Sequence, residues 1–170
     1  YGNKLDNFKF FLQFNPSFNV WEAQRDVSVY AAHHNFTEFL QLFHEMFPNC
    51  SINKPLDSQG NSPFMVALSR GHVSCAQYIR SVDPSLNLQK RNKIGLSAYG
   101  LALQSGSKDA FKYLTTIQPI FNIDEQSEGG FSLFLIAAQK GNLEALQYLA
   151  QMPGVVLDHV NQEGSNALIL

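Results

Sequence analysis

Apolar residues recur along the chain at spacings of three and four, in short runs divided by glycines and by polar segments. One arrangement spans residues 60–81 (GNSPFMVALSRGHVSCAQYIRS), and it returns at residues 95–116 and 130–151. This spacing places apolar side chains on one face of an α-helix. The pattern therefore predicts pairs of short helices, with Val73, Ala76 and Ile79 on the buried face of the second helix of the first pair.

Three series of residues repeat along the chain with a period close to 35. The first series is Gly60, Gly95, Gly130 and Gly164, the second is Asn35, Gly71, Gly106 and Gly141, and the third is Pro16, Pro48, Pro84, Pro119 and Pro153. A fixed period of this length is the sequence signature of a repeat array. We therefore expect a solenoid whose neighbouring units bury one another's apolar faces.

Each period contains the residue types that begin and end two helices. A serine follows the first glycine by two positions (Ser62, Ser97 and Ser132) and can cap a helix, and Pro63 suits the first helical position. The second series suits the left-handed conformation that ends a first helix, and the prolines end the second helix. Polar segments between each proline and the next glycine predict hairpin-like fingers. Tyr78, Tyr113 and Tyr148 occupy one column with Leu42 and Phe10, which predicts a packing ladder along the stack.

These units resemble the ankyrin repeat. That family's unit carries Asp, Gly and Thr-Pro-Leu-His, then two Ala, a Gly and a helix rich in Val and Leu. The segment DSQGNSPFMVAL, from Asp57 to Leu68, is the most similar copy, and Gly71-His72 also matches. Departures are Ser for the family's Thr, Ala98 and Leu133 for its Pro, and Met65, Gly100 and Leu135 for its His. The resemblance implies an all-α solenoid of helix-turn-helix units with β-hairpin-like finger loops.

The periods also set the expected domain organisation. We expect one ankyrin-repeat domain over residues 1–170, in which residues 1–20 form the second helix of a partial repeat. Full repeats are expected at 21–56, 57–91, 92–126 and 127–160, and residues 161–170 would begin a further repeat. Lone Trp21 would then pack at a finger-like position. Interrupted units at both ends suggest a piece of a longer array or of a multidomain protein.

Resemblance to ankyrin repeats implies a function in binding another protein through a concave groove. In that family the groove is lined by the fingertips and by the exposed ends of the first helices. The matching fingertip positions are Ser58, Gln59, Asn61, Lys93, Ile94, Leu96, Glu128, Gly129, Phe131, Gln162 and Glu163. The matching helix-end positions are His33, His34, Ser69, Arg70, Gln104, Ser105, Gln139 and Lys140. Among them Ile94, Leu96 and Phe131 suggest an apolar contact patch, although single exposed apolar residues are common.

Composition and charge exclude several classes of function. The chain has 170 residues, 45% of them hydrophobic, and a net charge of −2 without a cluster of Lys and Arg, which argues against binding nucleic acid or an anionic membrane. No apolar stretch is long enough to span a bilayer, and the first residues of this sequence do not follow the basic, apolar and small-residue order of a signal peptide. Cys50 and Cys75 lack the spacing of a disulfide framework or a zinc site. We expect a monomer in the reducing cytoplasm.

Candidate catalytic and cofactor-binding residues do not form a motif. The histidines at positions 33, 34, 44, 72 and 159 are scattered, and neither a His-Glu-x-x-His motif nor a phosphate-binding loop is present. We therefore predict a protein-binding scaffold that is not an enzyme and has no metal or cofactor. The alternative is a targeting or regulatory ankyrin module of a larger multidomain enzyme, such as a bacterial effector acting in the host cytosol. A catalytic motif in flanking sequence would distinguish the two.

Overall fold

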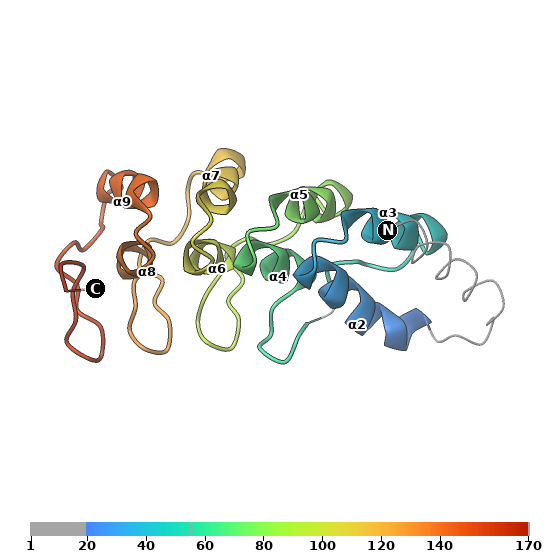
Figure 1. Cartoon of the computed structure of the whole chain (residues 1–170), viewed down its shortest axis with the longest axis horizontal. Helices are drawn as coiled ribbons and strands as arrows, with labels where there is room; N and C mark the ends of the chain where they lie inside the picture. Colours follow the sequence, from blue (N-terminus) through green and yellow to red (C-terminus); the bar gives the residue numbers. More distant parts are fainter. Residues whose placement is uncertain (1–19, 55, 170) are drawn as a thin grey trace.

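Paired helices stack side by side into an elongated array in the computed structural model, which describes residues 20–54 and 56–169. The helices are α2 (Val20–His33), α3 (Thr37–Met46), α4 (Pro63–Ser69), α5 (Val73–Val82), α6 (Ala98–Gln104), α7 (Lys108–Ile117), α8 (Leu133–Gln139) and α9 (Leu143–Ala150). Figure 1 shows α2, α4, α6 and α8 in one layer, α3, α5, α7 and α9 in a second, and the finger loops projecting from the first layer. The predicted all-α solenoid is confirmed.

The helix boundaries lie at the capping residues that the sequence indicates. The Ser62 hydroxyl accepts a hydrogen bond from the Met65 N–H at 3.4 Å, and Ser97 and Ser132 cap α6 and α8 in the same way. Pro63 occupies the first position of α4, where its missing N–H removes no hydrogen bond. Asn35 and Gly71 have φ of 57° and 73°, so the left-handed turn between the two helices is confirmed in the first two pairs.

The core runs through the layer of first helices. Residues 63–68 of α4 and 98–103 of α6 are all buried, because α4 packs between α2 and α6 and also contacts α5. Leu68 and Leu103 are fully buried, and each such side chain contributes about 1.5–3 kcal/mol by removal from water. The second helices are buried on one face only. In α5, Ala76 and Ile79 are buried as predicted, whereas Val73 is half-buried. Cys75, which the prediction did not include, is also buried, and Gln77 is exposed.

Each finger is closed by the same pattern of backbone hydrogen bonds. The Asn92 N–H donates to the Leu96 carbonyl at 2.9 Å, and the Gly95 N–H donates back to the Asn92 carbonyl at 3.2 Å. Neighbouring fingers are joined as well, because the Lys93 N–H donates to the Gln59 carbonyl at 2.9 Å. Among the described residues the fingers form no strand, only an isolated antiparallel bridge between Gln126 and Ser132. The fingers are tight turns linked in a row, and they resemble β-hairpins only in the backbone hydrogen bonds that close each turn.

The first described helix differs from its counterparts. Helix α2 has 14 residues, whereas α4, α6 and α8 have 7 each, and Trp21 lies in α2 rather than in a finger. The placement of Trp21 in a finger is therefore wrong. The segment VWEAQRDVSVYAAH contains no Gly or Pro to interrupt a helix, which explains why the helix is continuous. The partial repeat expected at residues 1–20 lies, apart from Val20, outside the described residues.

The tyrosine column lies on the outer helices α5, α7 and α9. Tyr78, Tyr113 and Tyr148 are half-buried, and so is Leu42 of α3. Tyr148 reaches the preceding unit, because its ring meets Phe111 edge-on at 5.8 Å between centroids and its hydroxyl donates to the Pro119 carbonyl at 3.3 Å. This contact joins the unit of α9 to that of α7. Phe10 lies outside the described residues.

Candidate functional site

The ends of the first helices supply most of the side chains that this layer exposes to solvent. We call His33, His34, Ser69, Arg70, Gln104, Ser105, Gln139 and Lys140 the helix-end row. His34, Arg70, Gln104, Gln139 and Lys140 are exposed, while His33, Ser69 and Ser105 are half-buried. The row thus lies at the surface, as the sequence predicts, because the helix interiors are packed between neighbouring repeats.

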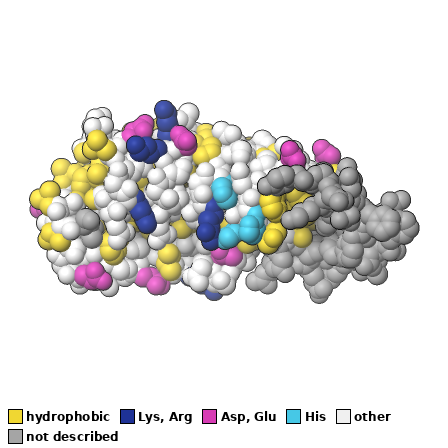
Figure 2. Space-filling model, in the orientation of Figure 1, with side chains coloured by type: hydrophobic (Ala, Val, Ile, Leu, Met, Phe, Trp, Pro, Cys, Tyr) yellow, Lys and Arg dark blue, Asp and Glu magenta, His cyan; other side chains and the backbone are white. Residues whose placement is uncertain are grey.

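Arg70 and two histidines meet where the end of α2 lies beside the end of α4. The Arg70 guanidinium donates from Nη2 to Nε2 of His33, so that nitrogen carries no proton. Burial, followed by the positive charge of Arg70, lowers the pKa of His33, which keeps the ring neutral. The His34 ring lies 4.7 Å from His33 and 4.4 Å from Tyr30, measured between centroids. Figure 2 shows histidine side chains beside a basic side chain on this face.

The fingertips form a second exposed row along the array. The exposed residues of this row are Ser58, Gln59, Lys93, Glu128, Gln162 and Glu163. Long side chains bridge successive tips, since Lys93 Nζ donates to the Ser58 carbonyl at 2.9 Å and Gln162 Nε2 donates to the Glu128 carbonyl at 2.7 Å. Together with the backbone bonds between fingers, these contacts fix the spacing of the tips.

Two predicted fingertip residues, Asn61 and Leu96, are buried, so their assignment to a contact surface is wrong. Leu96 is fully buried in the core, because the chain turns inward directly after Gly95 to begin α6. Asn61 is only 8% exposed, and its Oδ1 accepts from Asn92 Nδ2 at 2.8 Å. Ile94 and Phe131 are half-buried against the core. The predicted apolar patch is therefore not formed.

The residues that shape the fingertips belong to a fourth periodic series. Asp57, Asn92, Ser127 and Asn161 each accept backbone N–H bonds within their own finger. Asn92 is typical, since its Oδ1 accepts from Ile94 at 3.2 Å and from Leu96 at 2.9 Å. Asx side chains close turns in this way. The spacing of 35 residues between Asp57, Asn92 and Ser127 can be read from the sequence, but only Asp57 belongs to the ankyrin motif.

A family model described as ankyrin repeats, in three copies, matches residues 28–127. The chain belongs to the ankyrin-repeat family. No curated protein matches it. Ankyrin repeats generally mediate protein–protein interaction and are typically non-catalytic.

Gly100 occupies a position where the ankyrin motif has histidine, and the buried side chain of Glu125 lies beside it. Glu125, which is 2% exposed, accepts from the Ser97 N–H at 2.7 Å through Oε1. A Cβ at Gly100 would lie 2.5 Å from that oxygen and 2.7 Å from Leu96 Cδ2, so the carboxyl group fits only because Gly100 has no side chain. Burial raises the pKa of Glu125, and the hydrogen bonds from Ser97 partly oppose that shift. The contact lies within one repeat and ties the loop after α7 to the start of α6.

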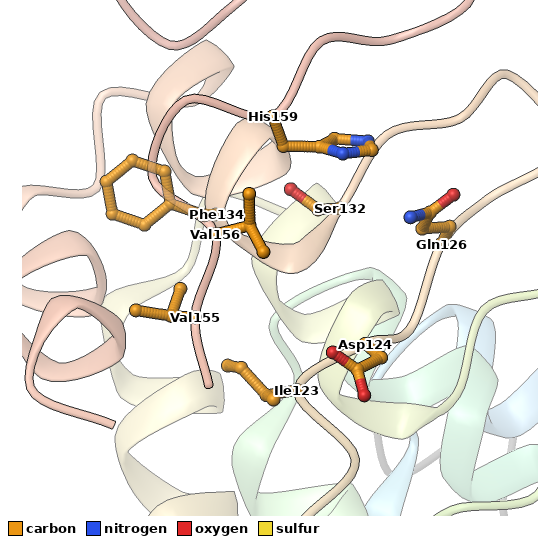
Figure 3. A pocket seen from close by; sticks show the side chains of 8 residues that line it. All are labelled: Ile123, Asp124, Gln126, Ser132, Phe134, Val155, Val156 and His159. Carbon is orange, nitrogen blue, oxygen red and sulfur yellow. The ribbon is translucent and has the colours of Figure 1, made fainter. Parts of the chain in front are cut away.

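A small hollow between successive loops holds Asp124, Ser132 and His159 (Figure 3), residue types that occur in catalytic triads. Here two of them make structural hydrogen bonds. Ser132 caps α8 by accepting from the Leu135 N–H at 3.3 Å, and His159 Nε2 donates to the Gly130 carbonyl at 2.9 Å. The hollow therefore lacks the arrangement that activates a serine nucleophile.

The remaining chemical candidates offer no reactive or metal-binding group within the described part of the chain. Both cysteines are free and buried, and burial raises the pKa of Cys75 to about 11, which keeps its thiol protonated. In residues 20–54 and 56–169 no group of His, Cys, Asp and Glu is placed to hold a metal ion. None of the helices described there has the length and apolar character needed to cross a bilayer.

Proposed function

We propose that this ankyrin array binds a partner protein on the face formed by the fingertips and the helix-end row. The supporting observation is that the interiors of α4 and α6 are entirely buried, while Arg70 and Gln104 at their ends and the neighbouring fingertips carry exposed polar side chains. A partner on this face therefore contacts side chains that lie outside the buried core. Because those side chains differ from repeat to repeat, the face carries information that the repeated core does not.

Rigidity supports the same proposal. Backbone hydrogen bonds join the finger at Gln59 to that at Lys93, the finger at Ile94 to that at Glu128, and the finger at Gly129 to that at Gln162, with donor–acceptor distances of 2.9, 3.0 and 3.2 Å. A surface that is already ordered loses less conformational entropy on binding, so more of the contact energy becomes affinity.

Two matched columns of exposed residues allow a direct test. Ser58, Lys93 and Glu128 lie at the fingertips with a spacing of 35, and Gln77, Lys112 and Gln147 lie on the outer helices with the same spacing. Peptides selected from a random display library on the purified chain are titrated against S58A/K93A/E128A and against the control Q77A/K112A/Q147A.

We expect the selected peptides to lose at least about tenfold in affinity, roughly 1.4 kcal/mol, for the fingertip variant and to bind the outer-helix variant normally. The opposite pattern would contradict the proposal. Circular dichroism and thermal unfolding of both variants establish that the fold is retained.

A further inference from the structure

We propose, resting on the function above, that the helix-end row recognises an acidic segment of the partner protein, with Arg70 and Lys140 as its two charged contacts. The row contains these two cations and two histidines, its other four residues are neutral, and none is acidic. This composition contrasts with the net charge of −2 of the whole chain and with the fingertips, where Lys93 lies in a row with Glu128 and Glu163. Complementary charge directs association and sets specificity.

The position of the two cations has a structural explanation that does not remove their binding capacity. Arg70 and Lys140 are the C-cap residues of α4 and α8, where a positive charge complements the helix dipole. Acidic residues follow on the far side of the turns, in the first turns of α3, α7 and α9 (Glu38, Asp109 and Glu144). Both cations are nevertheless exposed, and among the described residues neither makes an ion pair with these carboxylates.

Arg70 is oriented for a carboxylate by its neighbour. His33 accepts one guanidinium hydrogen bond and thereby restricts the side chain, while the remaining N–H donors have no hydrogen bond to other described residues. A guanidinium with a free edge binds a carboxylate through two parallel hydrogen bonds. Tyr30, which is 58% exposed, packs against His34 beside this group and offers an aromatic surface. Arg and Tyr together are the residue types that dominate binding energy at protein interfaces.

The spacing of the array sets the length of the segment. Helices that pack together lie about 8–10 Å apart, so Arg70 and Lys140, two repeats from one another, are separated by roughly 20 Å. An extended chain covers that distance in about six residues at about 3.3 Å each. The expected partner segment has acidic residues about six positions apart, with polar residues between them over Gln104.

An acidic protein segment fits this row better than a nucleic acid does. Binding to a phosphate backbone depends on several Lys and Arg contacts along a continuous basic surface. The helix-end row has two such residues, and uncharged Gln104 and Ser105 lie between them. A segment with two carboxylates matches that number and spacing.

The test uses charge reversal on two faces of the full chain. R70E/K140E changes the row, and K108E/K112E makes the same change of charge at two exposed positions of α7. A random-peptide library of about twelve residues per peptide, long enough for the six-residue spacing, is selected on the wild-type chain at low ionic strength. The enriched peptides are sequenced and titrated against both variants, and a fluorescent single-stranded oligonucleotide is titrated in parallel. Thermal unfolding confirms that both variants fold.

We expect the enriched peptides to carry an excess of Asp and Glu. They should bind R70E/K140E at least about tenfold more weakly than wild type and bind K108E/K112E normally, and their affinity for wild type should fall as salt is added. Enriched peptides without acidic residues, or equal binding by R70E/K140E, would overturn this inference. If, in either of these cases, the enriched peptides still bind S58A/K93A/E128A more weakly than wild type, the proposed function stands while the inference about an acidic segment fails. Oligonucleotide binding as strong as peptide binding, abolished by R70E/K140E, would also overturn it in favour of a nucleic acid.

Discussion

Asn92 is the residue whose removal should reveal how firmly the fingers are held. It is 8% exposed and makes three side-chain hydrogen bonds, two from its own finger and one to Asn61 of the preceding repeat. In N92A the Leu96 N–H and the Asn61 Oδ1 lose their buried partner. Each hydrogen bond contributes about 1 kcal/mol net, and an orphaned buried group costs about 1–3 kcal/mol. We expect N92A to lower the free energy of unfolding by about 3 kcal/mol.

A matched control is available at Asn87. Its Oδ1 accepts from the Gln89 N–H at 2.9 Å in the same kind of turn, but Asn87 is exposed and makes no hydrogen bond to another repeat among the described residues. N87A should therefore lower stability by about 0.5–1 kcal/mol. Urea unfolding followed by circular dichroism measures both variants. A loss for N92A no larger than that for N87A would refute the idea that buried Asx side chains hold the fingers and couple the repeats.

Three further predictions concern a buried acid, a glycine pair and a histidine. The pKa of Glu125 is higher in the folded chain than in the unfolded chain, so the folded chain binds the carboxyl proton more tightly. The stability that this adds is fully present below the ordinary pKa of 4.5 and is lost as pH rises through the pKa of the folded chain. Wild type should therefore gain stability relative to E125Q as pH falls from 7 towards 4.5, and parallel pH profiles in urea unfolding would contradict this. Gly71 and Gly106 both have φ of 73°, so alanine at either position carries a backbone strain of about 1–2 kcal/mol. Only at Gly71 does an added Cβ also come within 2.9 Å of a side chain, that of Ser107. G71A should therefore lower the melting temperature more than G106A does. The pKa of His33, followed by NMR, should lie below 6.5 and rise in R70A, whereas an unchanged value would exclude the Arg70 contact in solution.

The periodic pattern predicts what depends on local chemistry. Ser62 caps a helix and Asn35 adopts a left-handed turn because each conformation follows from the residue and its immediate neighbours. The exposed ends of the first helices, including Arg70, were also predictable, since a helix end projects beyond the packed layer.

The burial of fingertip residues was not predictable, because it depends on the neighbouring repeat. Leu96 lies one residue after a turn glycine, and only the direction in which the chain returns to α6 places it in the core. Asn61 is buried because Asn92 of the next finger bonds to it. The Glu125 contact needs the space at Gly100, on a different element of the same repeat, which no local pattern indicates.

Cross-saturation NMR on the complex with a selected peptide identifies the amides that lie at the interface, and it therefore decides whether a partner binds the fingertips and the helix-end row. We predict loss of signal at the fingertips, residues 58–59, 93–94 and 128–129, and at the helix ends, residues 69–70, 104–105 and 139–140. Loss of signal concentrated in the outer helices α5, α7 and α9 would contradict it.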